Sequence, residues 1–357
     1  MIATLARIPA YMSMRYLGWP RLMPANITVA VTYQCNSRCL TCNIWGKKKA
    51  SELSLGEYDK IFSSVGKSPY WITVSGGEPF LRKDLVDVVD SACALMEPGI
   101  VNIPTNGLVA GTAGRVGEIC EANPKTNFIV NLSLDGIGAK HDEIRGVPGA
   151  FEKAMKTYQE LKSLWHGNLE VGIHTVISRY NVTEIPKIYE FMESLKPSSY
   201  ITEIAEQRVE LDTMDSDITP SVNDYEEAVG FLKGKMRQDS AKGIPKLVRT
   251  LRGEYYDLVV KTLRQKRQII PCYAGFYSAQ IAPDGNVWAC CIRADPLGNL
   301  REVDYDFKKI WWGEKARSMR KSIKRGECFC PLANASYTNM LCNPGKILKI
   351  GAKLLVK

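Results

Sequence analysis

Three closely spaced cysteines, Cys35, Cys39 and Cys42, could share one inorganic cluster. They follow an apolar, β-branched run over residues 26–32 that predicts a buried strand, so the thiols are expected on the loop leaving that strand. A closed zinc or iron–sulfur site takes four protein ligands, whereas a four-iron cluster held by three cysteines leaves one iron open. The pattern predicts an unfinished metal site, with a zinc site completed by a distant Cys or His as the alternative.

A second motif follows about 35 residues later, where a predicted strand at 70–74 runs into Ser75-Gly76-Gly77-Glu78-Pro79. Paired glycines leave their backbone carbonyls unshielded, and Pro79 stiffens the turn, so this strand end can present acceptors to an ammonium group. A plain glycine turn is the alternative interpretation of this segment.

Together, the spacing Cys-x3-Cys-x2-Cys and the later Gly-Gly-Glu-Pro segment resemble the radical S-adenosylmethionine (SAM) superfamily. The resemblance implies that SAM chelates the open iron of a 4Fe-4S cluster, and that Gly76, Gly77, Glu78 and Pro79 hold its amino group. It also implies reductive cleavage of SAM to a 5'-deoxyadenosyl radical, which takes hydrogen from a C–H bond of a substrate. A one-electron donor such as flavodoxin or ferredoxin is then an expected partner.

Strand and helix patterns alternate six times between residues 26 and 240. This order predicts parallel pairing with right-handed crossovers, and hence an open (β/α)6 TIM-like barrel, the fold that the resemblance also implies. Strands are expected at 27–33, 70–75, 100–104, 127–134, 170–177 and 199–206, with helices at 56–65, 82–95, 112–121, 150–164, 184–194 and 221–237. Chemistry in such barrels gathers at the C-terminal ends of the strands.

Further polar segments follow the third and fourth predicted strands. The resemblance to radical SAM enzymes with an extra iron–sulfur domain implies that Ser133 contacts the SAM ribose and Arg145 its carboxylate. A strand-end hydroxyl suits a ribose, and a guanidinium fork matches a carboxylate. Asp135 is expected only to form a turn with Gly136. Many family members place an aromatic residue just before the third cysteine, but Thr41 stands here, so contact with adenine must come from elsewhere.

The sixth predicted strand carries two carboxylates, Glu203 and Glu206, on opposite faces, so one of them should point into the barrel. An inward carboxylate is costly unless it is paired, which makes both glutamates candidates for catalytic contact with the substrate. A structural ion pair with Arg208 is an equal alternative. His174, on the fifth strand, is expected to be a core histidine.

A second cysteine group lies near the C-terminus, around a predicted hairpin with its turn at Pro283-Asp284-Gly285. It resembles the SPASM/twitch modules of radical SAM enzymes, which implies a small α+β domain with one auxiliary 4Fe-4S cluster. The expected ligands are Cys272, Cys290, Cys328 and Cys330, with Cys342 able to replace one of the last two and Cys291 left open. A four-cysteine zinc site is the alternative.

Composition and charge are consistent with a cytoplasmic enzyme that works on something other than nucleic acid. The chain has 357 residues, 45% of them hydrophobic, and a formal net charge of +9, without an evident basic stripe interleaved with aromatics. No secretory leader is evident, so the eleven cysteines are expected to be reduced. The expected regions are an amphipathic extension at 1–24, the barrel at 25–240, a helical connector at 241–271, the auxiliary domain at 272–344 and a basic amphipathic tail at 345–357.

The two ends of the chain suggest a peripheral membrane contact. In the tail, Lys346, Lys349, Lys353 and Lys357 would share one helix face, and the extension at 1–24 combines aromatic and Arg residues with apolar ones. A lipid-linked substrate would fit such a contact, whereas docking of the tail on the barrel is the alternative.

The predicted reaction is hydrogen abstraction followed by oxidation or bond formation on an organic substrate that the sequence does not identify. One alternative is a maturase acting on a peptide or protein, although residues 1–24 are too few for the usual peptide-binding segment. Another is a non-catalytic iron–sulfur or zinc protein, which would not cleave SAM.

Overall fold

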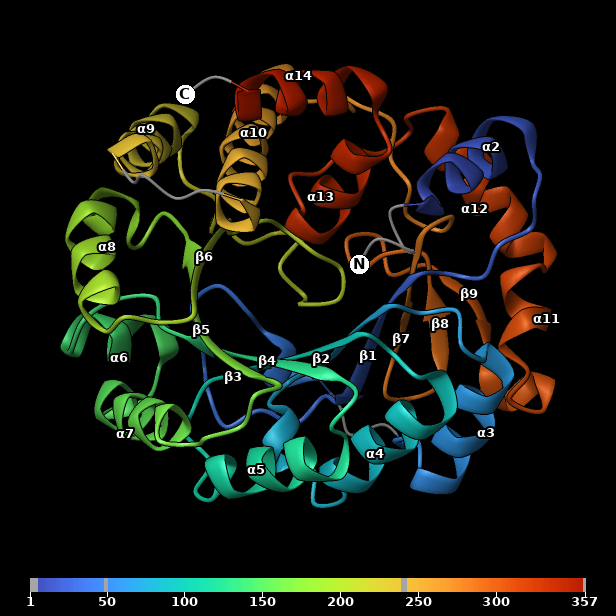
Figure 1. The fold of residues 1–357 in the computed structure, drawn as a ribbon, viewed down its shortest axis with the longest axis horizontal. Coiled ribbons are helices and arrows are strands. Elements are labelled where there is room, and N and C mark those ends of the chain that lie inside the picture. Colours follow the sequence, from blue (N-terminus) through green and yellow to red (C-terminus); the bar gives the residue numbers. More distant parts are fainter. Residues whose placement is uncertain (1–5, 48–50, 239–242, 356–357) are drawn as a thin grey trace.

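One continuous sheet of nine strands organises the computed structural model, which describes residues 6–47, 51–238 and 243–355 (Figure 1). The strand order is β6-β5-β4-β3-β2-β1-β7-β8-β9. The strands are β1 Asn26–Thr32, β2 Trp71–Gly76, β3 Ile100–Thr105, β4 Asn127–Ser133, β5 Leu169–Ile177, β6 Ser199–Ile204, β7 Ser278–Ile281, β8 Asn286–Trp288 and β9 Pro296–Asn299.

The first six strands are parallel, and a helical segment follows each of them. The helices around this part are α3 Leu55–Val65, α4 Leu85–Met96, α5 Thr112–Ala122, α6 Ala139–Arg145, α7 Ala150–Lys162, α8 Ile185–Ser194 and α9 Val222–Gln238. Apolar residues on the outward strand faces, such as Phe128 and Val130, are fully buried beneath them. The predicted partial (β/α)6 TIM-like barrel is confirmed.

The C-terminal strands extend the barrel sheet instead of forming a detached layer. β7 pairs in parallel with β1, aligning Ile27 with Ala279 and Val29 with Ile281. β8 is antiparallel to both of its neighbours, β7 and β9. The expected hairpin is present, with Gly285 at φ +86° in its turn. Since an uncovered apolar edge invites aggregation, β7 completes the barrel by covering the edge of β1.

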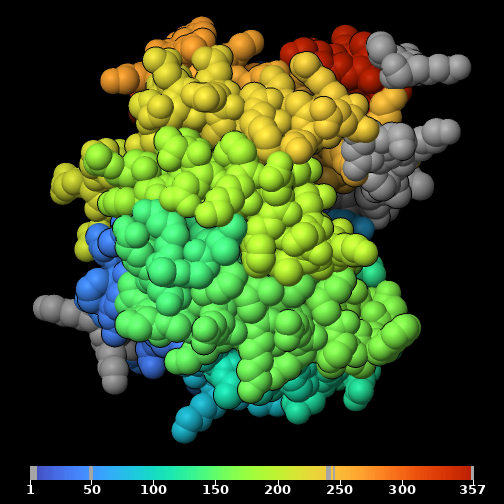
Figure 2. All heavy atoms as spheres, turned by 90° about the vertical axis from the view of Figure 1, so that its left-hand side faces the viewer, coloured from blue at the N-terminus to red at the C-terminus, as the bar shows by residue number. Residues whose placement is uncertain are grey.

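Helices from the later half of the chain close the side of the barrel between β6 and the auxiliary strands (Figure 1). They are α10 Ile244–Gln265, α13 Ala333–Leu341 and α14 Pro344–Leu355, while α2 Ile8–Leu17, α11 Phe307–Trp311 and α12 Glu314–Lys324 lie on the auxiliary side. Figure 2 shows the yellow residues of α9 and α10 above the green barrel helices, with red C-terminal residues at the upper edge.

The basic face of the C-terminal helix is turned toward the protein. The Nζ atoms of Lys346, Lys349 and Lys353 lie 2.8, 2.8 and 2.6 Å from carboxylate oxygens of Glu254, a fully buried residue of α10. The tail therefore docks on the fold, which was the alternative to a membrane-facing lysine row; Lys357 lies outside the described residues. Within the described part of the chain, no helix is long and apolar enough to cross a bilayer.

Candidate functional site

Two neighbouring elements hold the loop that carries the three N-terminal cysteines. The backbone N–H groups of Arg38 and Leu40 donate to the carbonyls of Arg145 and Ile144, at the end of α6, at 2.8 and 2.9 Å. On the other side, the Asn106 amide after β3 donates to Asn36 Oδ1 at 2.7 Å and to Ser37 Oγ at 3.0 Å. The cysteine loop is thus anchored at the C-terminal ends of the strands.

Three glycines permit the close backbone approaches at this edge. A Cβ on Gly76 would lie 2.2 Å from the Thr32 carbonyl oxygen, and one on Gly77 would lie 2.1 Å from that of Gln34. Gly146, at φ +64°, would bring a Cβ to 2.3 Å from the Arg38 carbonyl oxygen. The glycine pair therefore seats the end of β2 against the start of the cysteine loop, a packing role that adds to its predicted contact with SAM.

Glu78 is turned into the protein and ties two strand ends together. Its carboxylate accepts from Asn106 N at 2.7 Å, Thr105 Oγ1 at 2.9 Å and Phe80 N at 3.2 Å, and the residue is 1% exposed. Burial raises the pKa of Glu78 to about 6, although these donors favour the charged form. The side chain thus positions the Gly-Gly-Glu-Pro segment relative to Thr105 and Asn106.

Arg145 lies beside the cysteine loop in a buried ion pair. Its Nη2 is 2.9 Å from Asp135 Oδ2 and its Nη1 is 3.7 Å from Cys39 Sγ, while its Nε is buried without a partner. Although burial disfavours the charge, Asp135 and Cys39 keep the pKa of Arg145 above its ordinary value. The guanidinium is held charged next to a cysteine, with one donor unused.

The segment between β4 and α7 supports this pair. Asp135 accepts from Val176 N at 2.8 Å, and its own N–H donates to His141 Nδ1 at 3.2 Å. Burial lowers the pKa of His141 to about 4, so the ring is neutral and can accept. Asp142 accepts from the backbone of α7. The sequence interpretation missed the role of Asp135, whose signal was the arginine ten residues later.

The inner faces of the neighbouring strands continue the site. Ser133 aligns with His174 in the parallel register of β4 and β5, so their side chains share a face. His174 Nε2 lies 3.7 Å from Glu203 Oε2, which places Glu203 on the same inner face. Ser133 is partly buried there.

Glu206 lies just beyond the end of β6 and pairs with Arg208. The shortest contact, from Arg208 Nη2 to Glu206 Oε1, is 2.5 Å, and Glu206 Oε2 is buried without a partner. Burial, with a contribution from Glu203, raises the pKa of Glu206 to about 7. Glu206 therefore forms the ion pair with Arg208 that was the alternative to substrate contact. Its second carboxylate oxygen, Oε2, still has no partner in the described part of the chain and could accept from a substrate.

The C-terminal cysteines divide into two groups. Burial and the neighbouring Cys290 and Cys328 raise the pKa of Cys272 to about 11, and Cys272 and Cys290 act in the same way, after burial, on Cys330. Cys342 instead packs with apolar side chains beside α2. This placement favours Cys272, Cys290, Cys328 and Cys330 over Cys342 as ligands of one cluster.

Cys291 belongs to a buried apolar cluster against which Cys330 also packs, and it lies close to the Glu206–Arg208 pair. It lies 3.9 Å from Arg208 Nη1, and the backbone of Glu210 donates to its carbonyl at 3.3 Å. The thiol is buried. It therefore links the loop after β6 to the auxiliary region.

The donor groups of both sites are cysteine thiols, the usual ligands of iron–sulfur clusters. In residues 6–47, 51–238 and 243–355, no three His, Cys, Asp or Glu side chains converge as they would around one metal ion. The N-terminal site nevertheless offers three thiols on one loop, the unused Nε of Arg145 and a set of strand-end acceptors. These groups fit a 4Fe-4S cluster with SAM, and the four C-terminal cysteines fit an auxiliary 4Fe-4S cluster.

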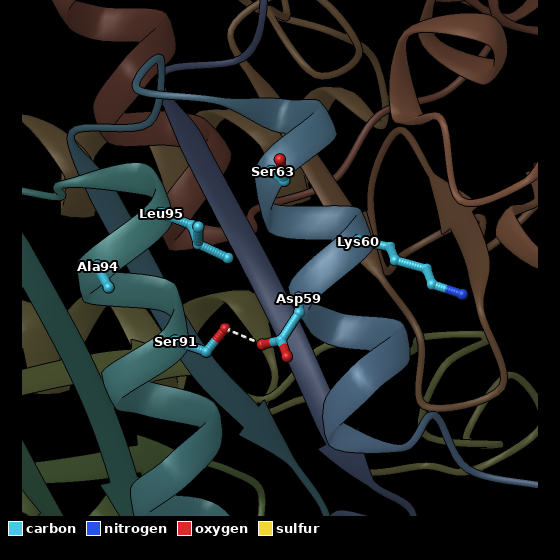
Figure 3. Close-up of a pocket in the computed structure, with 6 residues that line it drawn as sticks. All are labelled: Asp59, Lys60, Ser63, Ser91, Ala94 and Leu95. Carbon is cyan, nitrogen blue, oxygen red and sulfur yellow. Dashed lines mark hydrogen bonds between the residues drawn. The ribbon is translucent and has the colours of Figure 1, made fainter.

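The surface hollow shown in Figure 3 belongs to the outside of the barrel. It lies between α3 and α4 and is lined by Asp59, Lys60, Ser63, Ser91, Ala94 and Leu95. Ser91 Oγ donates to Asp59 at 2.5 Å across it. Since none of these residues belongs to the strand ends or the cysteine loop, the hollow is separate from the candidate site.

Fold and site together define a barrel enzyme with a three-cysteine cluster loop, and comparisons with known proteins identify its family. The family model described as "Radical SAM superfamily" matches residues 29–192, and that described as "Iron-sulfur cluster-binding domain" (SPASM) matches residues 272–331. The chain belongs to the radical SAM superfamily and has a C-terminal SPASM domain. Its cofactors are SAM, a SAM-binding 4Fe-4S cluster and auxiliary iron–sulfur clusters. Cys342 lies outside the matched SPASM range.

Several relatives cover most of the chain. The AdoMet-dependent heme synthase of Methanosarcina barkeri is 28% identical, over 85% of this chain and 84% of that protein. Mycofactocin maturase MftC of Mycobacterium tuberculosis is 26% identical, over 85% of this chain and 75% of that protein.

Solved structures agree on the fold. Native anSMEcpe with bound AdoMet has a TM-score of 0.64 at 14% identity and covers 94% of this chain and 100% of that one. Streptococcus suis SuiB bound to S-adenosylmethionine has a TM-score of 0.62 at 13% identity and covers 86% of this chain and 70% of that one.

Proposed function

We propose that this enzyme takes a hydrogen atom from an organic substrate held between its two cysteine sites and then oxidises the substrate or forms a bond on it. The observation that supports the proposal is the buried Glu206 Oε2, which has no partner among the described residues. Glu203 contributes to the raised pKa of Glu206, and Glu206, after burial, contributes to that of the auxiliary Cys330 thiol. When bound, the cluster and SAM supply the 5'-deoxyadenosyl radical.

The chain's own residues would bind and orient the reactants. Gly76, Gly77 and Pro79 offer backbone acceptors to the SAM amino group, while Arg145 offers its free Nε to the carboxylate. Ser133, on the inner strand face, would contact the ribose. Glu78 supports these contacts from inside the protein. We assign Glu203 and Glu206 to the substrate, for which Glu206 Oε2 is an unused acceptor.

SAM cleavage is the direct test. After anaerobic reconstitution with iron and sulfide, dithionite and SAM should yield 5'-deoxyadenosine, detected by mass spectrometry. We expect about eight irons per chain, four per cluster. A chain with Cys35, Cys39 and Cys42 changed to Ala should keep about half of the iron and produce no 5'-deoxyadenosine. Cleavage by that variant, or none by a fully loaded native chain, would exclude the proposal.

The relatives suggest more than one class of substrate. One relative is named a heme synthase and another a mycofactocin maturase, and a solved structure of SuiB is bound to the precursor peptide SuiA. Oxidation of an organic molecule and maturation of a peptide are therefore the two candidate reactions. Flavodoxin or ferredoxin is the proposed electron donor. The reconstituted enzyme would be mixed with deuterium-labelled candidate substrates of each class. Deuterium found in 5'-deoxyadenosine would identify the class from which hydrogen is taken.

We propose that a peripheral membrane contact of the cytoplasmic protein would use residues other than the tail lysines, which pair with Glu254. Leu17 and Trp19, at the end of α2, are 80% and 72% exposed, and Leu348 of α14 is 75% exposed. These apolar groups would have to carry the contact, and a lipid-linked substrate would fit it. Co-sedimentation with anionic vesicles, compared between the native chain and Leu17→Ser/Trp19→Ser, tests this proposal; a native chain that stays in the supernatant contradicts it.

A further inference from the structure

One short segment of the auxiliary region is strongly basic. Residues 307–325, which comprise α11 and α12, contain eight Lys or Arg and a single acidic residue, Glu314. Eight positive charges and one negative charge give this segment +7, compared with +9 for the whole chain. Arg320 is buried, and the other seven bases are exposed. Such a basic surface favours a partner of opposite sign.

The bases face solvent because the apolar side of α12 is buried in the protein. Ala316, Met319 and Ile323 are buried. The exposed bases of the segment are Lys308, Lys309, Lys315, Arg317, Lys321, Lys324 and Arg325. Lys309 and Arg325 have acidic partners at 3.9 and 3.6 Å. Among the described residues, no acidic side chain pairs with Lys308, Lys315, Lys321 or Lys324.

One end of this surface adjoins the proposed cluster ligands. α12 ends at Lys324, four residues before Cys328. Arg293, three residues after Cys290, donates from Nη1 to Ser322 Oγ of α12 at 2.8 Å. Phe329, between Cys328 and Cys330, is 46% exposed. The partly buried Cys328 is thus linked to the last turn of α12 by the short segment 325–327 and, near Cys290, by the Arg293–Ser322 contact.

We propose that the α12 basic face, defined as Lys308, Lys315, Arg317, Lys321 and Lys324, docks an acidic one-electron carrier protein beside the auxiliary cluster. The inference rests on the proposed function, because it requires a cluster at the C-terminal cysteines. A single electron passes between cluster and carrier, and no bond or proton changes place. Opposite charges on the two proteins would speed their encounter and fix the orientation of the complex.

The surface chemistry favours an acidic protein over a lipid bilayer. Helices that lie in a membrane interface insert apolar side chains between lipids. Within residues 307–325, all of which are described, no large apolar side chain is exposed. The face offers charge without an inserting group, and its position next to Cys328 gives an electron carrier a short route to the cluster.

Charge reversal on the α12 basic face provides the test. The reconstituted full chain and its Lys315→Glu/Lys321→Glu/Lys324→Glu variant would be compared for binding to a flavodoxin and a ferredoxin of acidic sequence, by interferometry at low and high salt. We expect affinity to fall about tenfold or more at low salt, with the difference shrinking as salt rises. The matched control, Lys153→Glu/Lys156→Glu/Lys187→Glu on α7 and α8, has the same charge change and should bind as the native chain does.

A second measurement separates this inference from the proposed function. In the chain with Cys35, Cys39 and Cys42 changed to Ala, only the auxiliary cluster would remain to accept an electron from a reduced carrier. The rate of this transfer would be measured in a stopped-flow instrument as bleaching of the iron–sulfur absorbance. Slower bleaching on charge reversal in α12, but not in the control, supports docking. Equal effects of both reversals, no effect of either, or loss of anionic-vesicle binding with carrier binding intact would overturn the inference. Absence of iron in this chain would instead contradict the proposed auxiliary cluster.

Discussion

Asp135 illustrates how one residue can shape this site by fixing the position of another, Arg145. Their charged groups lie 2.9 Å apart, buried beside Cys39, and replacing Asp135 with Asn would leave the guanidinium without a counter-charge. Breaking a buried pair in this way costs about 3 kcal/mol. We expect Asp135→Asn to lower the free energy of unfolding in urea by that amount. Asp304→Asn, which removes an exposed partner of Lys309, is the control and should show no measurable change; equal effects would mean that Asp135 is only a turn residue.

Glu78 should make stability depend on pH in an unusual direction. Burial raises its pKa from 4.5 to about 6, so the folded protein binds this proton more tightly than the unfolded chain does. The contribution of Glu78 to stability is therefore full below pH 4.5 and is lost as the pH rises through 6. Relative to Glu78→Gln, the native chain should lose about 2 kcal/mol between these limits, measured by urea unfolding at several pH values. A difference that is constant with pH, or that grows in favour of the native chain, would contradict this account.

Local spacing was enough to identify the cluster loop, but not the side chains that support it. Cys35, Cys39 and Cys42 lie within eight residues, so their convergence hardly depends on the fold. The orientation of Glu78 and the partner of Arg145 depend instead on how β3, β4 and α6 meet. Cys342 was considered as a ligand because the sulfurs of Cys328 and Cys330, separated by one residue, must bend tightly to reach different irons. Its position beside α2 depends on packing between the two ends of the chain.

At the scale of elements, the alternation of patterns predicted the six barrel strands because each is an apolar, β-branched run of ordinary length. The short helix α6, Ala139–Arg145, and the strand β9, Pro296–Asn299, were missed. Seven residues give too little periodicity to identify a helix, and β9 contains Pro296 and Gly298, which are unfavourable in strands. The amphipathic pattern of α14 was recognised, but periodicity alone could not determine which side its lysines face.

Glu254 should hold α14 on the fold. Although burial raises its pKa, hydrogen bonds from Lys346, Lys349 and Lys353 lower the pKa of Glu254 to about 2. The stabilisation is present at neutral pH and is lost as the pH falls from 4.5 toward 2. We expect Glu254→Gln to make amide exchange in residues 344–354 about tenfold faster at neutral pH, because the three lysines would lose their counter-charge.

The neighbouring carboxylate Glu226 supplies the control for this experiment. It pairs with Arg264 between α9 and α10, but its side chain is 47% exposed. Since exposed ion pairs contribute little, Glu226→Gln should leave exchange in α14 unchanged. Equal acceleration in both variants would show that α14 is held by apolar packing rather than by Glu254.

At the scale of the whole molecule, the barrel and the auxiliary region share one continuous sheet. β1 lies between β2 and β7, so each of its edges is paired with a strand from a different region. Side-chain contacts reinforce the junction: Arg301 Nε lies 2.6 Å from Glu57 Oε1, and the bond lowers the pKa of Glu57 to about 2. Arg15 on α2 donates to the Cys272 carbonyl at 3.0 Å. The sequence showed two regions with separate motifs, but gave no sign that one strand joins them.

This continuity predicts that the barrel cannot be isolated by cutting at the start of the SPASM domain. A chain ending at Ile270 would leave the β1 edge unpaired along Asn26, Ile27, Thr28 and Val29, together with the apolar side chains that β7 now covers. Exposed edges of this kind pair with other chains, so we expect this truncated form to aggregate at concentrations where the full chain stays monodisperse in size-exclusion chromatography. A chain ending at Asn343 keeps β7, β8 and β9 and loses only α14, so it should remain in solution with a lowered melting temperature. A soluble, folded chain ending at Ile270, with a normal iron content at Cys35, Cys39 and Cys42, would show that the auxiliary strands are dispensable for the barrel.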